Sequence, residues 1–147
     1  MKKIILFLFF TLLAFSFDID DFDKGMYELK EGNFNAAFEI FYAGCESNDD
    51  MACEELGLMY INDEVSPKLD TRLEKRDSLE LGILYLMKSC DELGYLNACE
   101  NILNLKENFT IQDEIIKRAK ERYSELFNEF NANENLKEDN ATQTRGE

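Results

Sequence analysis

The sequence predicts an all-α protein, in which antiparallel helix pairs closed by disulfides stack into a short α/α superhelical solenoid with a C-terminal capping helix. Three observations lead to this prediction. A pattern of two cysteines, a polar turn and Ala-Cys-Glu occurs twice, within residues 43–56 and 88–102. Apolar side chains recur around each copy at intervals of three and four residues, the spacing of one helix face. Strand signals are weak throughout the chain.

Residues 1–16 have the features of a secretory signal peptide. Two lysines precede an apolar core at residues 4–14, and Ala14 and Ser16 are small residues suited to a cleavage site. The mature protein would then meet an oxidising environment, so we expect it to be periplasmic or secreted by a bacterium. An uncleaved membrane anchor is the alternative, but the apolar run is shorter than the roughly 20 residues that span a bilayer. After cleavage we expect no membrane association.

The remaining residues suffice for one domain, which we place at residues 17–131. Hydrophobic spacing predicts helices near residues 19–31, 34–46, 51–62, 78–92, 97–106 and 111–131. Gly32 separates the first two helices, and Thr110 with Asp113 opens the last one. The last helix carries an apolar stripe suited to covering the end of a helical stack. From residue 132 to 147 the apolar content collapses, so composition predicts a disordered tail.

The helix that precedes each cysteine turn is repeated at an offset of 45 positions. Phe34, Ala37, Phe38, Phe41, Tyr42 and Cys45 correspond to Leu79, Gly82, Ile83, Leu86, Met87 and Cys90. The helix that follows each turn is repeated at an offset of 46, where Ala52, Cys53, Glu54 and Leu56 correspond to Ala98, Cys99, Glu100 and Ile102. The second copy degrades at its end, as terminal repeats commonly do.

The cysteine spacing predicts a reversal of the chain inside each unit, if the neighbouring cysteines are bonded. Cys45 and Cys53 are eight residues apart, so on one continuous helix their Cα atoms would be about 12 Å apart. A disulfide tolerates only roughly 4.4 to 6.8 Å. Residues 47–50 are turn and N-cap types, which allow two antiparallel helices to meet there. Cys90 and Cys99 repeat the arrangement.

Four cysteines allow three pairings, and the sequence does not decide between them. We predict the two local disulfides, Cys45 with Cys53 and Cys90 with Cys99, because each needs only one tight hairpin. On the chain-entropy model each would contribute about 2.5 kcal/mol of stability. A zinc site made of the four thiolates is the alternative, but zinc ligands usually pair two to four residues apart and the chain has no histidine. We therefore expect no metal and no cofactor.

The formal net charge is −15, and it becomes −17 once Lys2 and Lys3 are removed. Such a balance disfavours nucleic acids and anionic membrane surfaces as partners. It more often serves solubility than the choice of a basic partner. One segment, residues 62–77, contains the only proline and four basic residues, Lys68, Arg72, Lys75 and Arg76. This basic cluster either pairs with acidic helix faces of its own domain or contacts an acidic ligand.

A family resemblance is carried by three segments, GMYELKEGNFNAAFEIFYAGC, MACEELGLMY and DSLELGILYLMKSC followed by NACENI. They resemble the SEL-one-like repeat (SLR) family, which is related to the tetratricopeptide repeats (TPR), and the cysteine placement resembles its secreted branch, the Helicobacter cysteine-rich proteins. The resemblance covers roughly residues 25–105. It implies SLR/TPR-like helix pairs stacked into a right-handed superhelix, with the cysteine pair of each unit bridged. Gly82, where alanine is usual, and the insertion at residues 62–77 depart from the family pattern.

The sequence contains no recognisable catalytic residues. Without histidine, Ser-His-Asp and Cys-His catalysis are excluded. Members of the resembling branch are described as penicillin-binding or weak β-lactamase proteins, but this chain lacks the Ser-x-x-Lys and Lys-Thr-Gly elements of serine β-lactamases. Glu54 and Glu55 suit the first turn of a helix, whereas Asp91 and Glu92, at a helix end, are better candidates for ligand contacts. A solvated helix face is nevertheless the preferred interpretation of Asp91 and Glu92. The tyrosines at repeat positions are interpreted as packing residues: Tyr27, Tyr42, Tyr60 and Tyr85.

Asn140 is a candidate glycosylation site. The segment at residues 138–142, Glu-Asp-Asn-Ala-Thr, satisfies the Asn-x-Thr sequon and has an acidic residue two places before the asparagine, which resembles the extended bacterial form. A disordered, exported tail would be accessible to a glycosyltransferase.

Together these features predict a non-catalytic, exported module that binds a protein, a peptide or a cell-wall component through a short concave face. The first alternative is a β-lactam- or muropeptide-binding hydrolase, which rests on the family resemblance alone. The second alternative is a secreted factor that interacts with a host. The identity of the partner and the oligomeric state are left open by the sequence.

Overall fold

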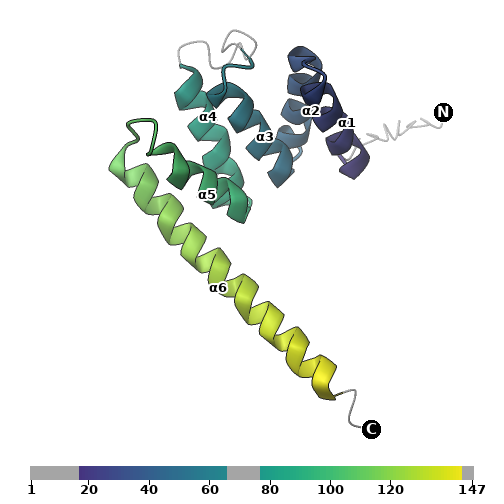
Figure 1. The fold of residues 1–147 in the computed structure, drawn as a ribbon, viewed down its shortest axis with the longest axis vertical. Helices are drawn as coiled ribbons and strands as arrows, with labels where there is room; N and C mark the ends of the chain where they lie inside the picture. Colours follow the sequence, from purple (N-terminus) through teal and green to yellow (C-terminus); the bar gives the residue numbers. More distant parts are fainter. Residues whose placement is uncertain (1–16, 66–76, 144–147) are drawn as a thin grey trace, which may run out of the picture.

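The computed structural model describes residues 17–65 and 77–143, with side chains as far as residue 134. All regular elements in these ranges are helical (Figure 1). They are α1 (Ile19–Lys30), α2 (Phe34–Glu46), α3 (Asp50–Ile61), α4 (Ser78–Met87), the π-helical turn η2 (Lys88–Glu92), α5 (Leu96–Leu105) and α6 (Asp113–Gln143). One disulfide joins α2 to α3, and another joins η2 to α5. The predicted all-α class is confirmed for the described part of the chain.

Aspartate side chains begin three of the helices. Asp18 accepts hydrogen bonds from two backbone N–H groups in the first turn of α1. Asp49 accepts one from the Ala52 N–H at 2.8 Å at the start of α3, and Asp77 accepts one from the Glu80 N–H at 2.7 Å at the start of α4. Each of these bonds satisfies a backbone donor that has no partner within its own helix. The sequence therefore determines these three helix starts locally.

Residues with a positive φ allow the chain to reverse between helices. Asn48, between α2 and α3, has a φ of 63°, a left-handed conformation that asparagine tolerates better than most residues. Gly94 has a φ of 80° between η2 and α5, where a larger residue would be strained. Both reversals bring the cysteines of a unit together.

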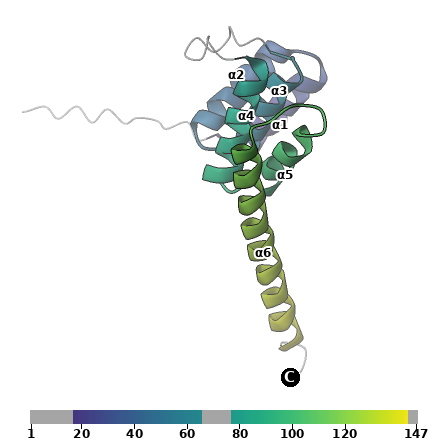
Figure 2. The ribbon, with the colours of Figure 1, turned by 90° about the vertical axis from the view of Figure 1, so that its left-hand side faces the viewer.

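Each helix packs mainly against its neighbours along the chain. α1 lies on α2, α2 on α3, α3 on α4, α4 on α5 and α5 on α6, while η2 contacts α3, α5 and α6 (Figure 1 and Figure 2). One cluster of buried side chains includes Phe41 and Tyr60. The other includes Leu86, Ile102 and Ala119, from α4, α5 and α6. The core therefore extends along the row of helices.

α3 and α4 form the most extensive helix contact, and two glycines permit it. A Cβ at Gly57 would lie 2.9 Å from the carbonyl oxygen of Gly82, and a Cβ at Gly82 would lie 2.8 Å from the carbonyl oxygen of Gly57. Because both obstacles are backbone atoms, rotation of a side chain would not relieve them. Gly57 and Gly82 therefore allow α3 and α4 to approach closely.

The single helix expected at residues 78–92 is divided in the structure. α4 ends at Met87, and the π-helical turn η2 follows it. A π-helical turn is wider than an α-helical turn. In this wider turn Lys88, Ser89 and Cys90 each bond to a different part of the neighbouring helices, as described below. The other observed helix limits, apart from the end of α6, lie within about two residues of those predicted.

α6 is longer than the composition indicated. Its first part packs on the second core cluster through residues that include Ala119 and Tyr123. The helix then continues away from the body to Gln143 (Figure 1). Residues 132–143, for which we predicted disorder, are therefore helical in the structure. This segment has little apolar surface to bury, but it also has no glycine or proline to break a helix.

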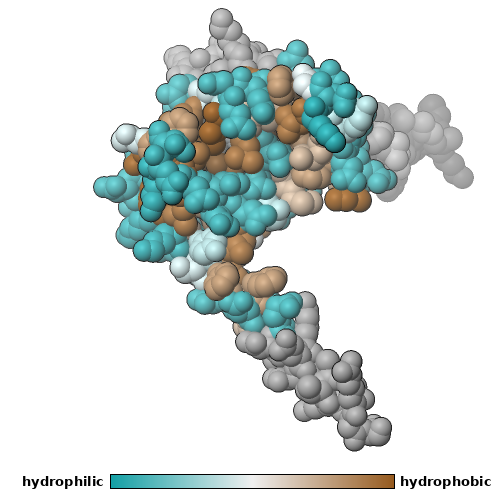
Figure 3. Space-filling model, in the orientation of Figure 1, coloured by the Kyte–Doolittle hydropathy of each residue, from teal (hydrophilic) through white to brown (hydrophobic). Residues whose placement is uncertain are grey.

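Apolar side chains are exposed on α6 where it leaves the body (Figure 3). They include Phe127 and Phe130, which are 44% and 58% exposed. Phe127 stacks on Tyr123 with the ring centroids 5.9 Å apart, so the apolar stripe of α6 extends past the surface that it covers. Only the first part of α6 therefore packs on the body.

None of the helices in the described ranges combines the length and the apolar content that crossing a membrane requires. Three sequence-based expectations lie outside these ranges: the signal peptide at residues 1–16, the basic residues of the insertion at residues 68–76, and residues 144–147 of the tail.

We expect Gly82→Ala to lower the free energy of unfolding by about 1 to 3 kcal/mol, because the added methyl group would overpack the contact between α3 and α4. Helix propensity alone would favour alanine by about 1 kcal/mol, so the sign of the change separates the two effects. Urea denaturation followed by circular dichroism would measure it. Asn128→Ala, at an exposed position of α6, is the control and should be neutral or slightly stabilising. A Gly82→Ala variant as stable as the wild type would contradict the close contact.

Candidate functional site

The four cysteines form two buried disulfides. Cys45 is bonded to Cys53 with their Cα atoms 4.5 Å apart, and Cys90 is bonded to Cys99 with their Cα atoms 4.8 Å apart. The first joins α2 to α3, and the second joins η2 to α5. Each of the four cysteine residues is at most 1% exposed. The zinc site considered as an alternative is contradicted, because no thiolate remains to bind a metal.

Two side chains of the π-helical turn η2 form hydrogen bonds to the turn between α2 and α3, one on each side of it. The Lys88 ammonium donates a hydrogen bond to the carbonyl oxygen of Cys45 at 2.6 Å, near the end of α2. The Ser89 hydroxyl, which is fully buried, donates one to the carbonyl oxygen of Asp50 at 2.7 Å, at the start of α3. Isolated π-helical turns are frequent at functional sites because they change the direction of side chains within a helix.

A cavity of about 320 Å³ opens beside this turn, and we call it the η2 groove. It is lined by residues from α2, α4, η2 and α6: Glu46, Leu84, Tyr85, Met87, Lys88, Asp91, Glu92 and Arg118. Arg118 forms an ion pair with Asp91 across the groove. Leu84 is 38% exposed, so its side chain is accessible from the groove.

The lining of the η2 groove combines three kinds of contact. Lys88 and Arg118 provide N–H donors, and Asp91 and Glu92 provide carboxylate acceptors. Leu84 and Met87 provide apolar surface between them. A peptide segment presents the complementary combination, because its backbone carries both donors and acceptors and its side chains can be apolar.

The four carboxylates singled out in the sequence, those of Glu54, Glu55, Asp91 and Glu92, lie in two different parts of the structure. Asp91 and Glu92 both line the η2 groove. Glu54 lies instead between α3 and α5, where it is 7% exposed and accepts a hydrogen bond from the Asn101 side chain at 2.7 Å. α3 begins at Asp50, which is the acidic residue of its first turn, so the expected first-turn position of Glu54 is wrong. Glu55, also on α3, is outside the groove.

The pKa of Glu54 is raised to about 7, chiefly by burial and next by the charge of Glu55. The hydrogen bond from Asn101 acts in the opposite direction, and the charge of Asp50 adds a smaller upward contribution to the same pKa. Burial also raises the pKa of Glu55, with the charge of Glu64 as the second cause. The contact between α3 and α5 therefore contains a carboxyl group that changes its charge near neutral pH.

The tyrosines at repeat positions pack as predicted, with one exception. Tyr60 and Tyr85 are buried and stack with ring centroids 5.8 Å apart, which links α3 to α4. Tyr42 stacks on Phe38 at 5.6 Å. Tyr27 is 62% exposed, so its packing role is wrong for the described structure. It lies on α1, the outermost helix at that end of the row (Figure 1).

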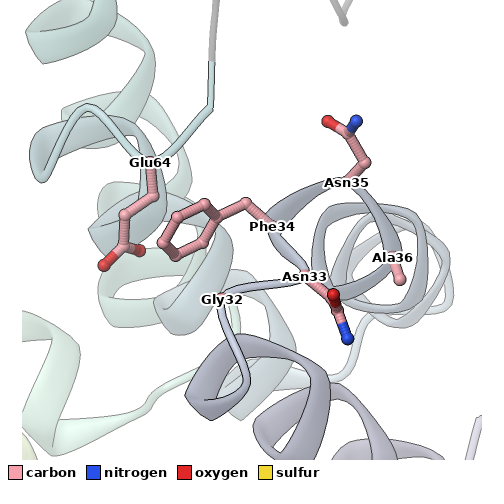
Figure 4. Close-up of a pocket in the computed structure, with 6 residues that line it drawn as sticks. All are labelled: Gly32, Asn33, Phe34, Asn35, Ala36 and Glu64. Carbon is pink, nitrogen blue, oxygen red and sulfur yellow. The ribbon is translucent and has the colours of Figure 1, made fainter.

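A second cavity, of about 510 Å³, lies at the start of α2 (Figure 4). The ring of Phe34 extends toward the carboxylate of Glu64, which follows α3, and Gly32, Asn33, Asn35 and Ala36 complete the lining. Burial raises the pKa of Glu64. This cavity has a single charged residue, whereas the η2 groove has five, so the η2 groove is the better candidate for a binding site.

Four residues of the η2 groove were not identified from the sequence: Glu46, Leu84, Lys88 and Arg118. Lys88 and Arg118 carried a usable signal, since basic residues are the minority in this acidic chain. Their meeting depends on how α6 packs against η2, which no local pattern reports. Asn140 lies in the last turns of α6, and its side chain is outside the described part of the structure.

No protein-family model, no curated protein and no solved structure matches this chain. Membership of the SLR family therefore remains a proposal.

We expect the free energy of unfolding to decrease as the pH rises from about 4.5 to about 7.5. The folded-state pKa of Glu54 is raised to about 7 from 4.5. The stability supplied by its neutral form is therefore complete below pH 4.5 and is lost as the pH passes 7, by an amount on the order of 2 kcal/mol. Glu54→Gln, which keeps the oxygen that accepts from Asn101, should reduce this slope.

Urea denaturation at several pH values would measure the effect, with the exposed Glu100→Gln as the matched control. If Glu54→Gln and wild-type protein show the same dependence on pH, Glu54 is not the titrating group.

Proposed function

We propose that this protein is a non-catalytic, exported binding module of stacked helix pairs, whose η2 groove holds a segment of a protein or peptide partner. A cell-wall component with a peptide portion is included in this class. The single observation that carries the proposal is the η2 groove itself. Four helical elements contribute to it, and side chains of η2 connect its wall to the corner closed by Cys45 and Cys53.

Two findings support a short α/α superhelical solenoid of the SLR/TPR type. Each helix packs mainly on its neighbours in the chain, which is the contact pattern of repeat proteins. Each sequence unit also has its own disulfide between the two members of a helix pair, at matching positions. In such a stack α2, α4 and α6 occupy equivalent positions, and these three helices all contribute to the η2 groove.

Export is supported by the two disulfides, which are typical of proteins outside the reducing cytoplasm. The lysine-led apolar segment at residues 1–16 agrees with this. The module would then act in the periplasm or outside the cell. A role as a secreted, host-interacting factor uses the same groove and differs only in the origin of the partner.

Binding is favoured over hydrolysis by the state of the groove residues. Asp91 is held in an ion pair with Arg118. Two serines, Ser47 and Ser89, are each next to a groove residue in the sequence, and both hydroxyls donate to backbone oxygens. None of these groups is placed to attack a β-lactam carbonyl. The hydrolase alternative is therefore supported by the family resemblance alone.

A photo-crosslinking residue at position 84 tests the proposal, because Leu84 is exposed within the groove. In cells that export the full chain, we expect this position to yield one or a few discrete adducts. The same residue at position 128, exposed on the far part of α6, should not yield them. Glu92→Lys in the position-84 variant should reduce adduct formation by roughly tenfold, since about 1.4 kcal/mol of lost contact has that effect.

The same adducts from both positions, or adducts unaffected by Glu92→Lys, would contradict binding in the groove. A nitrocefin assay on the purified protein tests the alternative: turnover that is lost with Asp91→Asn and Glu92→Gln would favour the hydrolase.

A further inference from the structure

A third cavity lies next to the η2 groove, between the start of α4 and the start of α6. Its volume is about 240 Å³, and its lining contains four aliphatic side chains: Leu79, Ile83, Ile111 and Ile115. Asp77, Glu80, Thr110 and Gln112 complete it. None of the four aliphatic residues is fully buried, so apolar surface is accessible there.

This third cavity and the η2 groove follow the same pair of helices. On α4, Ile83 lines the third cavity, whereas Leu84 and Met87, one and four positions later, line the η2 groove. On α6, Ile115 lines the third cavity, and Arg118, one turn later, lines the η2 groove. We call the two cavities together the α4–α6 trough.

The length of the trough suits an extended chain. From Leu79 to Asp91, twelve positions at the α-helical rise of 1.5 Å give at most about 18 Å, because the wider π-helical turn rises less per residue. About five residues of an extended peptide cover this distance at roughly 3.3 to 3.6 Å per residue. One end of the trough is mainly apolar, and the other end has most of the charged groups.

The charges around the trough favour a basic occupant. Its lining contains the carboxylates of Asp77, Glu80, Glu46, Asp91 and Glu92, against the two basic residues Lys88 and Arg118. The chain as a whole has a formal net charge of −15, so its long-range field attracts positive ligands as well.

We infer that the α4–α6 trough binds an extended segment of about five residues that combines aliphatic and basic side chains. An aliphatic side chain enters the cavity formed by Ile83 and Ile115, and a lysine or arginine of the same segment lies near Glu92 in the η2 groove. This inference rests on the proposed function, because it specifies the ligand of the same groove. An acidic segment would lack the basic contact with Glu92, and a purely polar segment would lack the aliphatic contact with Ile83 and Ile115.

Fluorescence anisotropy with end-blocked, labelled hexapeptides tests the inference on the mature protein at physiological salt. A peptide of alternating leucine and lysine should bind at least tenfold more tightly than one of leucine and glutamate. It should also bind at least tenfold more tightly than one of serine and lysine, which keeps the charge but loses the aliphatic contact.

Two variants and one matched control locate the binding. Glu92→Lys and Ile83→Ser should each weaken binding of the leucine–lysine peptide at least tenfold, with circular dichroism confirming the fold. Glu129→Lys makes the same change in net charge at an exposed position of α6 beyond the body, and it should change binding less than twofold. Glu92→Lys does not depend on the apolar packing of Ile83, so it keeps the test valid if Ile83→Ser unfolds.

The outcomes separate this inference from the proposed function. Equal weakening by Glu92→Lys and Glu129→Lys would show non-specific attraction and overturn the inference. If all three peptides bound equally and Leu84→Glu weakened them all, the η2 groove would still be a peptide site, but its basic and aliphatic preference would be wrong. If none of them bound, the inference would fail, and the proposed function would be tested by the crosslinks from position 84.

Discussion

The bonds from η2 to the preceding helix pair are the interactions on which the rest of the structure depends. Lys88 and Ser89 bond the carbonyl oxygens of Cys45 and Asp50, on the two sides of the turn between α2 and α3. The next residue, Cys90, is covalently bonded to Cys99. Three consecutive residues thus connect the two disulfide-closed corners. Because a disulfide acts largely by restricting the unfolded chain, these hydrogen bonds and the packing of α3 on α4 are what hold one unit against the next.

The same turn also creates the groove. A continuous α-helix through residues 78–92 would place its side chains at regular angles, whereas the wider π-helical turn places Lys88 toward the preceding corner and Asp91 toward α6. The residues that stabilise the junction and the residues that line the groove are therefore neighbours in the chain. Structure and binding surface share one element, so the shape of the groove depends on the integrity of both helix pairs.

The acidic character of the chain has two consequences in the structure. On the surface it keeps the protein highly charged, which favours solubility and attracts positive partners. One of its carboxyl groups, that of Glu54, lies in the interior, in the contact between α3 and α5, where Asn101 is its hydrogen-bond partner. A charged carboxylate at this buried position is costly, so the protonated form is favoured in the folded state and the pKa of Glu54 rises to about 7.

The sequence by itself determined the helical class, most helix limits and the place of the reversals, because N-caps such as Asp49 and Asp77, turn residues such as Asn48, and helical spacing of apolar side chains act over a few residues. It also singled out Asp91 and Glu92, which both line the η2 groove. Only the tertiary structure decided the division of α4 from η2, the burial of Glu54 and the meeting of Leu84 with Arg118. Each of these depends on contacts between segments far apart in the chain, and no local pattern contains their geometry. The extension of α6 past residue 131 is the intermediate case: composition correctly indicated that the segment has little to bury, but a helix without glycine or proline can continue where no core supports it.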